Sequence, residues 1–117
     1  MLARDYHEDG IHILRVEGEI DLASSPELRV LLMAHAKARR RSLLLDFSEV
    51  KYVDSSALAT LIEYVRKARD FGGRFALAQV SARVHTVFQL ARLHEFLSIY
   101  PTLAEAKAAL SAPSPPA

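Results

Sequence analysis

A largely apolar run in the middle of the chain, SLLLDF at residues 42–47, sets the strongest limit on the fold. The run does not alternate between apolar and polar side chains, so both of its faces must be buried. This is typical of a central strand in a sheet that is covered on both sides. The run therefore predicts an α/β domain, with strands beside it and helices on its faces.

Two segments before this run predict an antiparallel pair of strands at one edge of the sheet. Residues 11–17 (IHILRVE) largely alternate between apolar and polar side chains, as a half-buried strand does. They are expected to pair with residues 3–7 through a turn at residues 8–10. Gly18 is expected to end the second strand before the segment 19–21.

One helix is predicted on either side of the central run. Ser24 and Glu27 have the spacing of a capping box, and the cations at residues 37–41 mark the end of the helix they open. Asp54 is expected to cap a second helix over residues 55–71, which a pair of glycines ends. The inward residues of the first helix are expected to be Leu28, Leu31, Leu32 and His35. Those of the second are expected to be Leu58, Leu61, Ile62 and Val65.

The rest of the chain continues the alternation of strand and helix. Residues 74–80 predict a strand, Ser81 a helix start, and residues 96–100 a short last strand. Thr102 and Glu105 repeat the capping-box spacing and open a terminal helix. The inward residues of the third helix are expected to be Val84, Val87, Phe88 and Ala91.

These elements predict one domain over residues 1–111. Strand–helix–strand connections imply parallel strands with right-handed crossovers, so the sheet is mixed, with four to five strands covered by about four helices. A chain of 117 residues has room for a single core. Residues 112–117 are expected to be a disordered tail of proline, serine and alanine, because they carry too little apolar surface.

Composition excludes several classes of function. A formal net charge of +1 argues against broad nucleic-acid binding, and the absence of cysteine excludes disulfides and thiolate metal sites. The first ten residues lack the apolar core of a signal peptide, and no run is long enough to span a membrane, which favours the cytoplasm. No cofactor or metal is expected, because the histidines show no ligand spacing. They are His7, His12, His35, His85 and His94.

The densest polar cluster is Asp54-Ser55-Ser56, where a strand gives way to a helix. Helix capping is one explanation of this cluster, because Asp at the N-cap and Ser in the first turn are common. A first-turn hydroxyl is also exposed, and a phosphate on it would meet free backbone N–H groups and the positive end of the helix dipole. The cluster therefore also predicts a phosphorylation switch.

Around this cluster the sequence resembles a known family. The run LLLDFSEVKYVDSSALATLIEYVRKARDFGGRFALA resembles the core of STAS domains of the anti-sigma factor antagonist type. The resemblance extends upstream to VEGEID and downstream to ARVHTVFQLARLHEFLSIYPTLAEA, and so covers roughly residues 5–110. The family commonly has glycine after the two serines, where this chain has Ala57.

The resemblance implies a partner, a modification and a function. Such proteins bind a serine kinase that is also an anti-sigma factor, and thereby release a sigma factor that regulates transcription. The kinase phosphorylates the serine that follows the aspartate, here Ser55, and a PP2C-type phosphatase reverses this. The expected partner-binding residues are Gly18, Asp21, Asp54, Ser56, Ala59 and Thr60. Together with Ser55 and Glu63 they are expected to form one patch, with Ala59, Thr60 and Glu63 facing outward.

Two alternatives remain open. STAS domains also serve as unphosphorylated subunits of lipid-transport ABC systems or of stress-signalling assemblies. Asp21, Asp46 and Asp54 all lie near predicted strand ends, as in a phospho-aspartate receiver, but the lysine that a receiver needs after a late strand is missing. No nucleophile elbow is present either, so we expect a binding protein rather than an enzyme.

Overall fold

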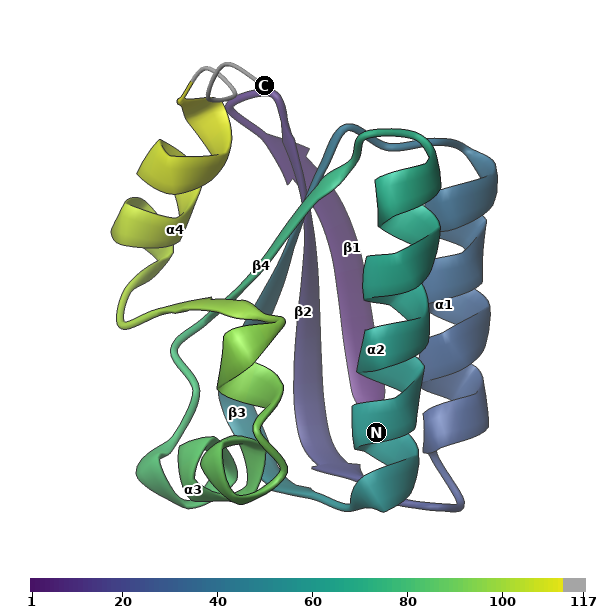
Figure 1. The fold of residues 1–117 in the computed structure, drawn as a ribbon, viewed down its shortest axis with the longest axis vertical. Coiled ribbons are helices and arrows are strands. Elements are labelled where there is room, and N and C mark those ends of the chain that lie inside the picture. The colour runs from purple at the N-terminus through teal and green to yellow at the C-terminus, as the bar shows by residue number, and fades with distance from the viewer. Residues whose placement is uncertain (113–117) are drawn as a thin grey trace.

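The computed structural model describes residues 1–112, which form one five-stranded sheet with the strand order β1-β2-β3-β4-β5 (Figure 1). The strands are β1 (Leu2–Glu8), β2 (Ile11–Ile20), β3 (Ser42–Val53), β4 (Arg74–Ala78) and β5 (Ser98–Tyr100). The pair β1–β2 is antiparallel, and all other neighbours are parallel. The predicted mixed sheet with an antiparallel edge is confirmed.

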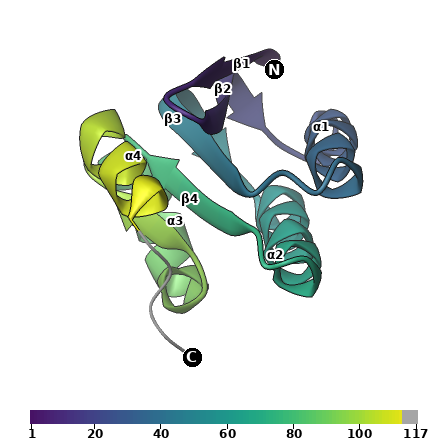
Figure 2. The same cartoon turned by 90° about the horizontal axis from the view of Figure 1, so that it is seen from above.

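Helices cover both faces of this sheet, as Figure 2 shows from above. The helices are α1 (Ser25–Lys37), α2 (Ser55–Asp70), α3 (Ala82–Leu90), a 3-10 turn (Leu93–Glu95) and α4 (Leu103–Ser111). Helices α1 and α2 lie side by side on one face, and α4 lies on the other. Among residues 1–112, no helix has the length and apolar character that crossing a membrane requires.

The central strand β3 explains this two-sided arrangement. Leu43, Leu45 and Phe47 point into the core beneath α1, α2 and α3, whereas Leu44 points into a smaller core beneath α4. All four side chains are fully buried. The prediction that residues 42–47 form a strand buried on both faces is therefore confirmed.

Strands β2 and β3 both run further than predicted. Gly18 does not end β2: it adopts a φ of 101° beside a register irregularity, and the strand continues to Ile20. β3 likewise continues through a polar stretch as far as Val53, which pairs with Ile20. The polar side chains of Ser48, Glu49 and Lys51 hid this extension, because backbone pairing with β2 and the burial of Val50 alone keep the segment extended.

Helix starts were predicted with mixed success. Asp54, Ser81 and Thr102 each accept a hydrogen bond from a first-turn N–H, as expected. Ser24 does not cap α1, because its hydroxyl turns back into the preceding loop and donates to the carbonyl of Glu19. The predicted capping box at α1 is wrong.

The buried face of α2 also differs from the prediction. Of the expected inward residues only Leu61 is fully buried, while Leu58, Ile62 and Val65 lie half-buried at the margin. The buried positions are Ala57, Thr60, Leu61, Tyr64 and Ala68. The helix is thus rotated about its axis, so that small residues and one tyrosine face the sheet.

Smaller differences lie in the last third of the chain. Strand β4 ends at Ala78 and β5 begins only at Ser98, so both are shorter than predicted. Ala91 is exposed at the end of α3, although Val84 and Phe88 are buried as expected. Of the predicted tail, Ala112 is the C-cap of α4, and residues 113–117 lie outside the described residues.

Candidate functional site

The candidate site lies where β2 and β3 end side by side and α2 begins. Ile20 and Val53 are paired at the end of the two strands, and the Asp54 N–H donates to the Ile20 carbonyl at 3.2 Å. One oxygen of the Asp54 carboxylate, Oδ2, accepts a hydrogen bond from the Leu22 N–H at 3.0 Å. The loop after β2 and the start of α2 are thereby joined, although they are 32 residues apart.

The second oxygen of Asp54, Oδ1, caps α2. It accepts hydrogen bonds from the N–H of Ser56 at 2.9 Å and of Ala57 at 3.3 Å, and from the Ser56 hydroxyl at 2.5 Å. The hydroxyl of Ser56 is the main cause that lowers the pKa of Asp54, and the backbone donors add to it. The carboxylate is therefore ionised near neutral pH.

This cap corrects one part of the phosphorylation hypothesis. The first-turn N–H groups of Ser56 and Ala57 were expected to be free to receive a phosphate, but Asp54 already occupies them. A phosphate at Ser55 would instead lie next to an ionised carboxylate. The helix dipole would still favour it, while the adjacent negative charge would oppose it.

The two serines of the motif differ in their surroundings. Ser55 is the first residue of α2 and is exposed, and no hydrogen bond to its hydroxyl occurs within residues 1–112. Ser56 is half-buried, and its hydroxyl donates to Asp54. Only the Ser55 hydroxyl is thus both accessible and uncommitted.

Asp21 lies at the same end of the sheet, as expected, but its carboxylate serves the loop. Its Oδ1 accepts hydrogen bonds from the N–H groups of Ala23 and Ser24, each at 3.0 Å, and from the Ser24 hydroxyl at 3.2 Å. The side chain is half-buried. Asp21 therefore fixes the shape of the segment that is bonded to Asp54.

Gly18 lies within β2, where its register partner is Val50, and not in the loop. Its positive φ of 101° is costly for any residue with a side chain. A Cβ at this position would lie 3.7 Å from the Met1 Cα, which is ordinary contact. Gly18 therefore has a conformational role in β2, and the structure does not bring it against Ser55.

The three residues of α2 expected to face outward behave differently from one another. Ala59 is exposed, as predicted. Thr60 is buried, with 7% of its surface exposed, and its hydroxyl donates to the Ser56 carbonyl at 2.9 Å, so its outward placement was wrong. Glu63 is partly exposed and accepts two hydrogen bonds from the Arg29 guanidinium of α1, at 2.7 and 2.8 Å.

One prominent residue near Asp21 and the start of α2 was not predicted from the sequence. The Leu22 side chain is 77% exposed, directly after Asp21 and beside the start of α2. A large apolar side chain on a short loop with no core to enter is a signal that could have been noticed. We use the term docking surface below for Asp21, Leu22, Ser55 and Ala59.

The phospho-aspartate alternative finds no support in the arrangement of the aspartates. Asp46 is buried in β3, where it accepts hydrogen bonds from the Ser48 N–H at 3.0 Å and the Gln79 side-chain amide at 3.2 Å. Asp21 and Asp54 are each engaged in the loop and cap described above. The three carboxylates do not converge on one pocket within the described part of the chain.

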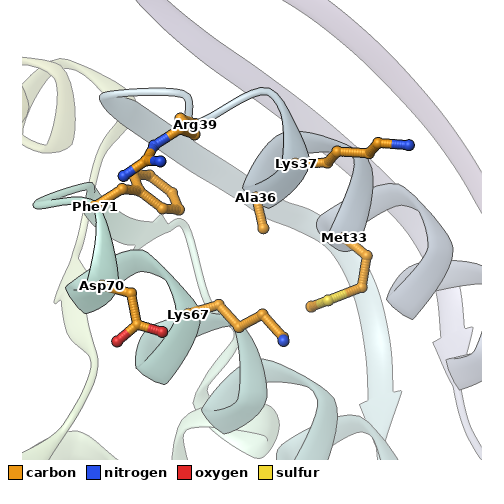
Figure 3. A pocket seen from close by; sticks show the side chains of 7 residues that line it. All are labelled: Met33, Ala36, Lys37, Arg39, Lys67, Asp70 and Phe71. Carbon is orange, nitrogen blue, oxygen red and sulfur yellow. The ribbon is translucent and has the colours of Figure 1, made fainter.

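A separate pocket of about 500 Å³ lies between the C-terminal halves of α1 and α2 (Figure 3). Its lining consists of Met33, Ala36, Lys37, Arg39, Lys67, Asp70 and Phe71. It is at the opposite end of α2 from Ser55 and therefore is not part of the candidate site.

Comparison with known proteins shows which family this chain is similar to. The family model described as the STAS domain matches residues 3–106. An anti-sigma F factor antagonist of Paenibacillus polymyxa is 28% identical over 96 residues, which cover 80% of this chain and 81% of that protein.

Two solved structures share the fold. An anti-sigma factor antagonist from Mycobacterium paratuberculosis has a TM-score of 0.87 and 25% identity, covering 95% of this chain and 94% of that one. The Bacillus cell fate determinant SpoIIAA in its phosphorylated form has a TM-score of 0.71 and 19% identity, covering 93% of this chain and 99% of that one. With its sheet order, its capped α2 and the match over residues 3–106, the chain belongs to the STAS domain family.

Proposed function

We propose that this chain is an anti-sigma factor antagonist whose binding is switched by phosphorylation of Ser55. Several relatives carry the name anti-sigma factor antagonist, among them the Paenibacillus protein. One structural relative, SpoIIAA of Bacillus, has been solved in a phosphorylated form. These relatives motivate the proposal, and the local chemistry of Ser55 and Asp54 supports it.

The observation that carries the proposal is the contrast between the two serine hydroxyls. Ser55 is exposed at the start of α2, and its hydroxyl has no hydrogen-bond partner in residues 1–112. Ser56 is half-buried, and its hydroxyl bonds to Asp54 at 2.5 Å. A kinase can reach the first without disturbing the fold, whereas modifying the second would remove a contact of the helix cap.

In the unphosphorylated state the docking surface binds an anti-sigma factor that is also a serine kinase. Leu22 supplies exposed apolar area and Ala59 allows close approach of the partner's backbone. Asp21 holds the loop that presents Leu22. Occupation of the anti-sigma factor by this chain releases the sigma factor.

Phosphorylation ends this docking. The Ser55 oxygen takes the γ-phosphoryl group of ATP, ADP leaves, and the hydroxyl proton passes to a base of the kinase. The added charge of about −1.5 to −2 lies beside ionised Asp54. Since Asp54 already occupies the N–H groups of Ser56 and Ala57, these groups cannot bind the phosphate, and its charge faces the partner.

On this proposal the chain is a ligand and a kinase substrate, and it catalyses nothing itself. A PP2C-type phosphatase that hydrolyses the phosphoserine would restore binding. Isothermal titration of the unphosphorylated chain against the cognate anti-sigma factor tests the function directly. We expect a complex that displaces the sigma factor, while binding only to a transport ATPase would support the transporter alternative.

A further inference from the structure

A cluster of imidazole and carboxylate side chains lies at the other end of α1 from the docking surface. Asp5 comes from β1, His12 from β2 and His35 from the last turn of α1. One ligand atom from each of these side chains lies within 4.8 Å of the others. The fold thus assembles three potential metal ligands that are far apart in the sequence.

The side chains in this cluster face one another closely. The His35 Nε2 lies 2.8 Å from the Asp5 Oδ2, and the ring centroids of His12 and His35 are 5.7 Å apart. His7 lies opposite His12 across the β1–β2 pair, with a centroid distance of 4.5 Å. A third imidazole is therefore available next to the first three side chains as a fourth ligand.

Packing does not account for the histidine on α1. His35 is 5% exposed, and its Nδ1 has no hydrogen-bond partner among the described residues. A buried polar atom without a partner costs free energy, whereas a leucine would fill the same space without that cost. The bond to Asp5 satisfies Nε2 only, so one of the two ring nitrogens of this buried imidazole has no partner among the described residues.

We propose that Asp5, His12 and His35 form a binding site for a divalent transition-metal ion of the Zn²⁺ type, which His7 can complete. Imidazole nitrogen with one carboxylate oxygen is a common ligand set for Zn²⁺, while Ca²⁺ and Mg²⁺ prefer oxygen ligands alone. The site has one buried, fixed ligand and two ligands on an accessible edge hairpin.

Coordination of one ion requires the His35 Nε2 and the Asp5 Oδ2, now 2.8 Å apart, to separate, and the remaining ligand atoms, all within 4.8 Å, to approach. Bonds of about 2.0–2.2 Å in a tetrahedral site place neighbouring ligand atoms about 3.3–3.5 Å apart. Asp5 is exposed and His12 half-exposed, so both can close on an ion held against His35.

A bound ion would add a link between the last turn of α1 and the β1–β2 hairpin, whose strands already pair along the length of β1. An ion that binds only the folded chain raises the melting temperature, and a free concentration about a hundredfold above Kd would raise it by roughly 10 °C. The same ion would sit close to Arg40, whose positive charge opposes it.

The test is titration of the untagged, full-length chain with Zn²⁺ near neutral pH, by calorimetry and by thermal unfolding. We expect one ion per chain and a higher melting temperature, and with Co²⁺ the absorption spectrum of a tetrahedral site. His12→Asn and Asp5→Asn should each weaken binding at least tenfold, and Arg40→Ala should strengthen it. His94→Gln, an exposed histidine outside the cluster, is the matched control and should bind as the wild type does.

Two results would overturn the proposal. One is the absence of saturable binding by the wild-type chain, in which case the cluster is a hydrogen-bonded histidine–aspartate pair only. The other is binding that survives both His12→Asn and Asp5→Asn unchanged, which would place the ion elsewhere. His35→Leu adds a further check. If that variant does not fold, His12→Asn still tests the proposal, because His12 is partly exposed.

Discussion

The carboxylate of Asp54 accepts the backbone N–H of Leu22 at 3.0 Å, and this one hydrogen bond joins the loop after β2 to the start of α2. Ser55 follows Asp54 directly, so the proposed phosphorylation site and the exposed Leu22 side chain lie on two segments that this bond joins. On the proposed function, a charge added at Ser55 would act on a partner bound over Leu22 without any rearrangement of the fold.

Asp54 should make the stability of the chain depend on pH. Hydrogen bonds, first that of the Ser56 hydroxyl, lower its pKa in the folded state, so its contribution is present above the unfolded pKa of about 4. That contribution is lost as the pH falls through the folded pKa. Urea unfolding should show a lower free energy of unfolding for Asp54→Asn than for the wild type near neutral pH. This difference should shrink in acid.

The matched control for this experiment is Asp70→Asn, at the exposed C-terminal end of α2. It removes none of the cap contacts and should leave the free energy of unfolding within about 0.5 kcal/mol of the wild-type value. If the difference in the free energy of unfolding between the wild type and Asp54→Asn stayed constant into strongly acidic buffer, it would contradict an ionised cap.

Leu61 should be a costly residue of α2 to truncate. Its side chain is fully buried between the helix and the sheet, so Leu61→Ala leaves a cavity and should cost about 2–5 kcal/mol. Leu90→Ala is the control, because that side chain is 82% exposed and should change stability by less than about 0.5 kcal/mol. Chemical denaturation measures both, and equal losses would refute the assigned face of α2.

Leu22 should contribute to partner binding and not to stability. Its side chain is 77% exposed and contributes little to the core, so Leu22→Ser should leave the melting temperature nearly unchanged. Affinity for the anti-sigma factor should fall by about tenfold or more. Asp21→Arg is a poorer probe, because Asp21 holds the loop through hydrogen bonds to Ala23 and Ser24.

The control for this experiment is Leu90→Ser on α3, which lies on the other side of α2 from α1 (Figure 2). Calorimetry of the two variants against the anti-sigma factor should separate them. Equal affinities for both would place the interface away from the loop after β2.

Much of the fold could be predicted from the sequence, since local signals agreed with the tertiary structure. The apolar run around Leu44 required a strand with two covered faces, and Asp54 and the glycines after α2 marked both ends of that helix. The rotation of α2 could not be predicted. Two residue sets fit helical spacing around Leu61, and contact with the sheet selected the set that includes Tyr64.

The candidate site was predicted in position but not in its internal contacts. The Asp54-Ser55-Ser56 motif located the start of α2 correctly, yet Asp54 occupies the N–H groups that were expected to be free. These bonds depend on side-chain rotamers, which sequence spacing does not determine. The histidine cluster was invisible for a different reason, because its ligands come from three separate elements.

The most direct test of the account is to incubate the chain with its cognate serine kinase and ATP, and to map the phosphate by mass spectrometry. Titration of Ser55→Ala, Ser55→Asp and the control Ser56→Ala against the anti-sigma factor completes it. We expect one phosphate, on Ser55. The affinity of the phosphorylated chain for the anti-sigma factor should fall about a hundredfold or more, and that of Ser55→Asp should also fall. Ser55→Ala should bind constitutively. Phosphate on Ser56, or undiminished binding by the chain phosphorylated at Ser55, would contradict the switch.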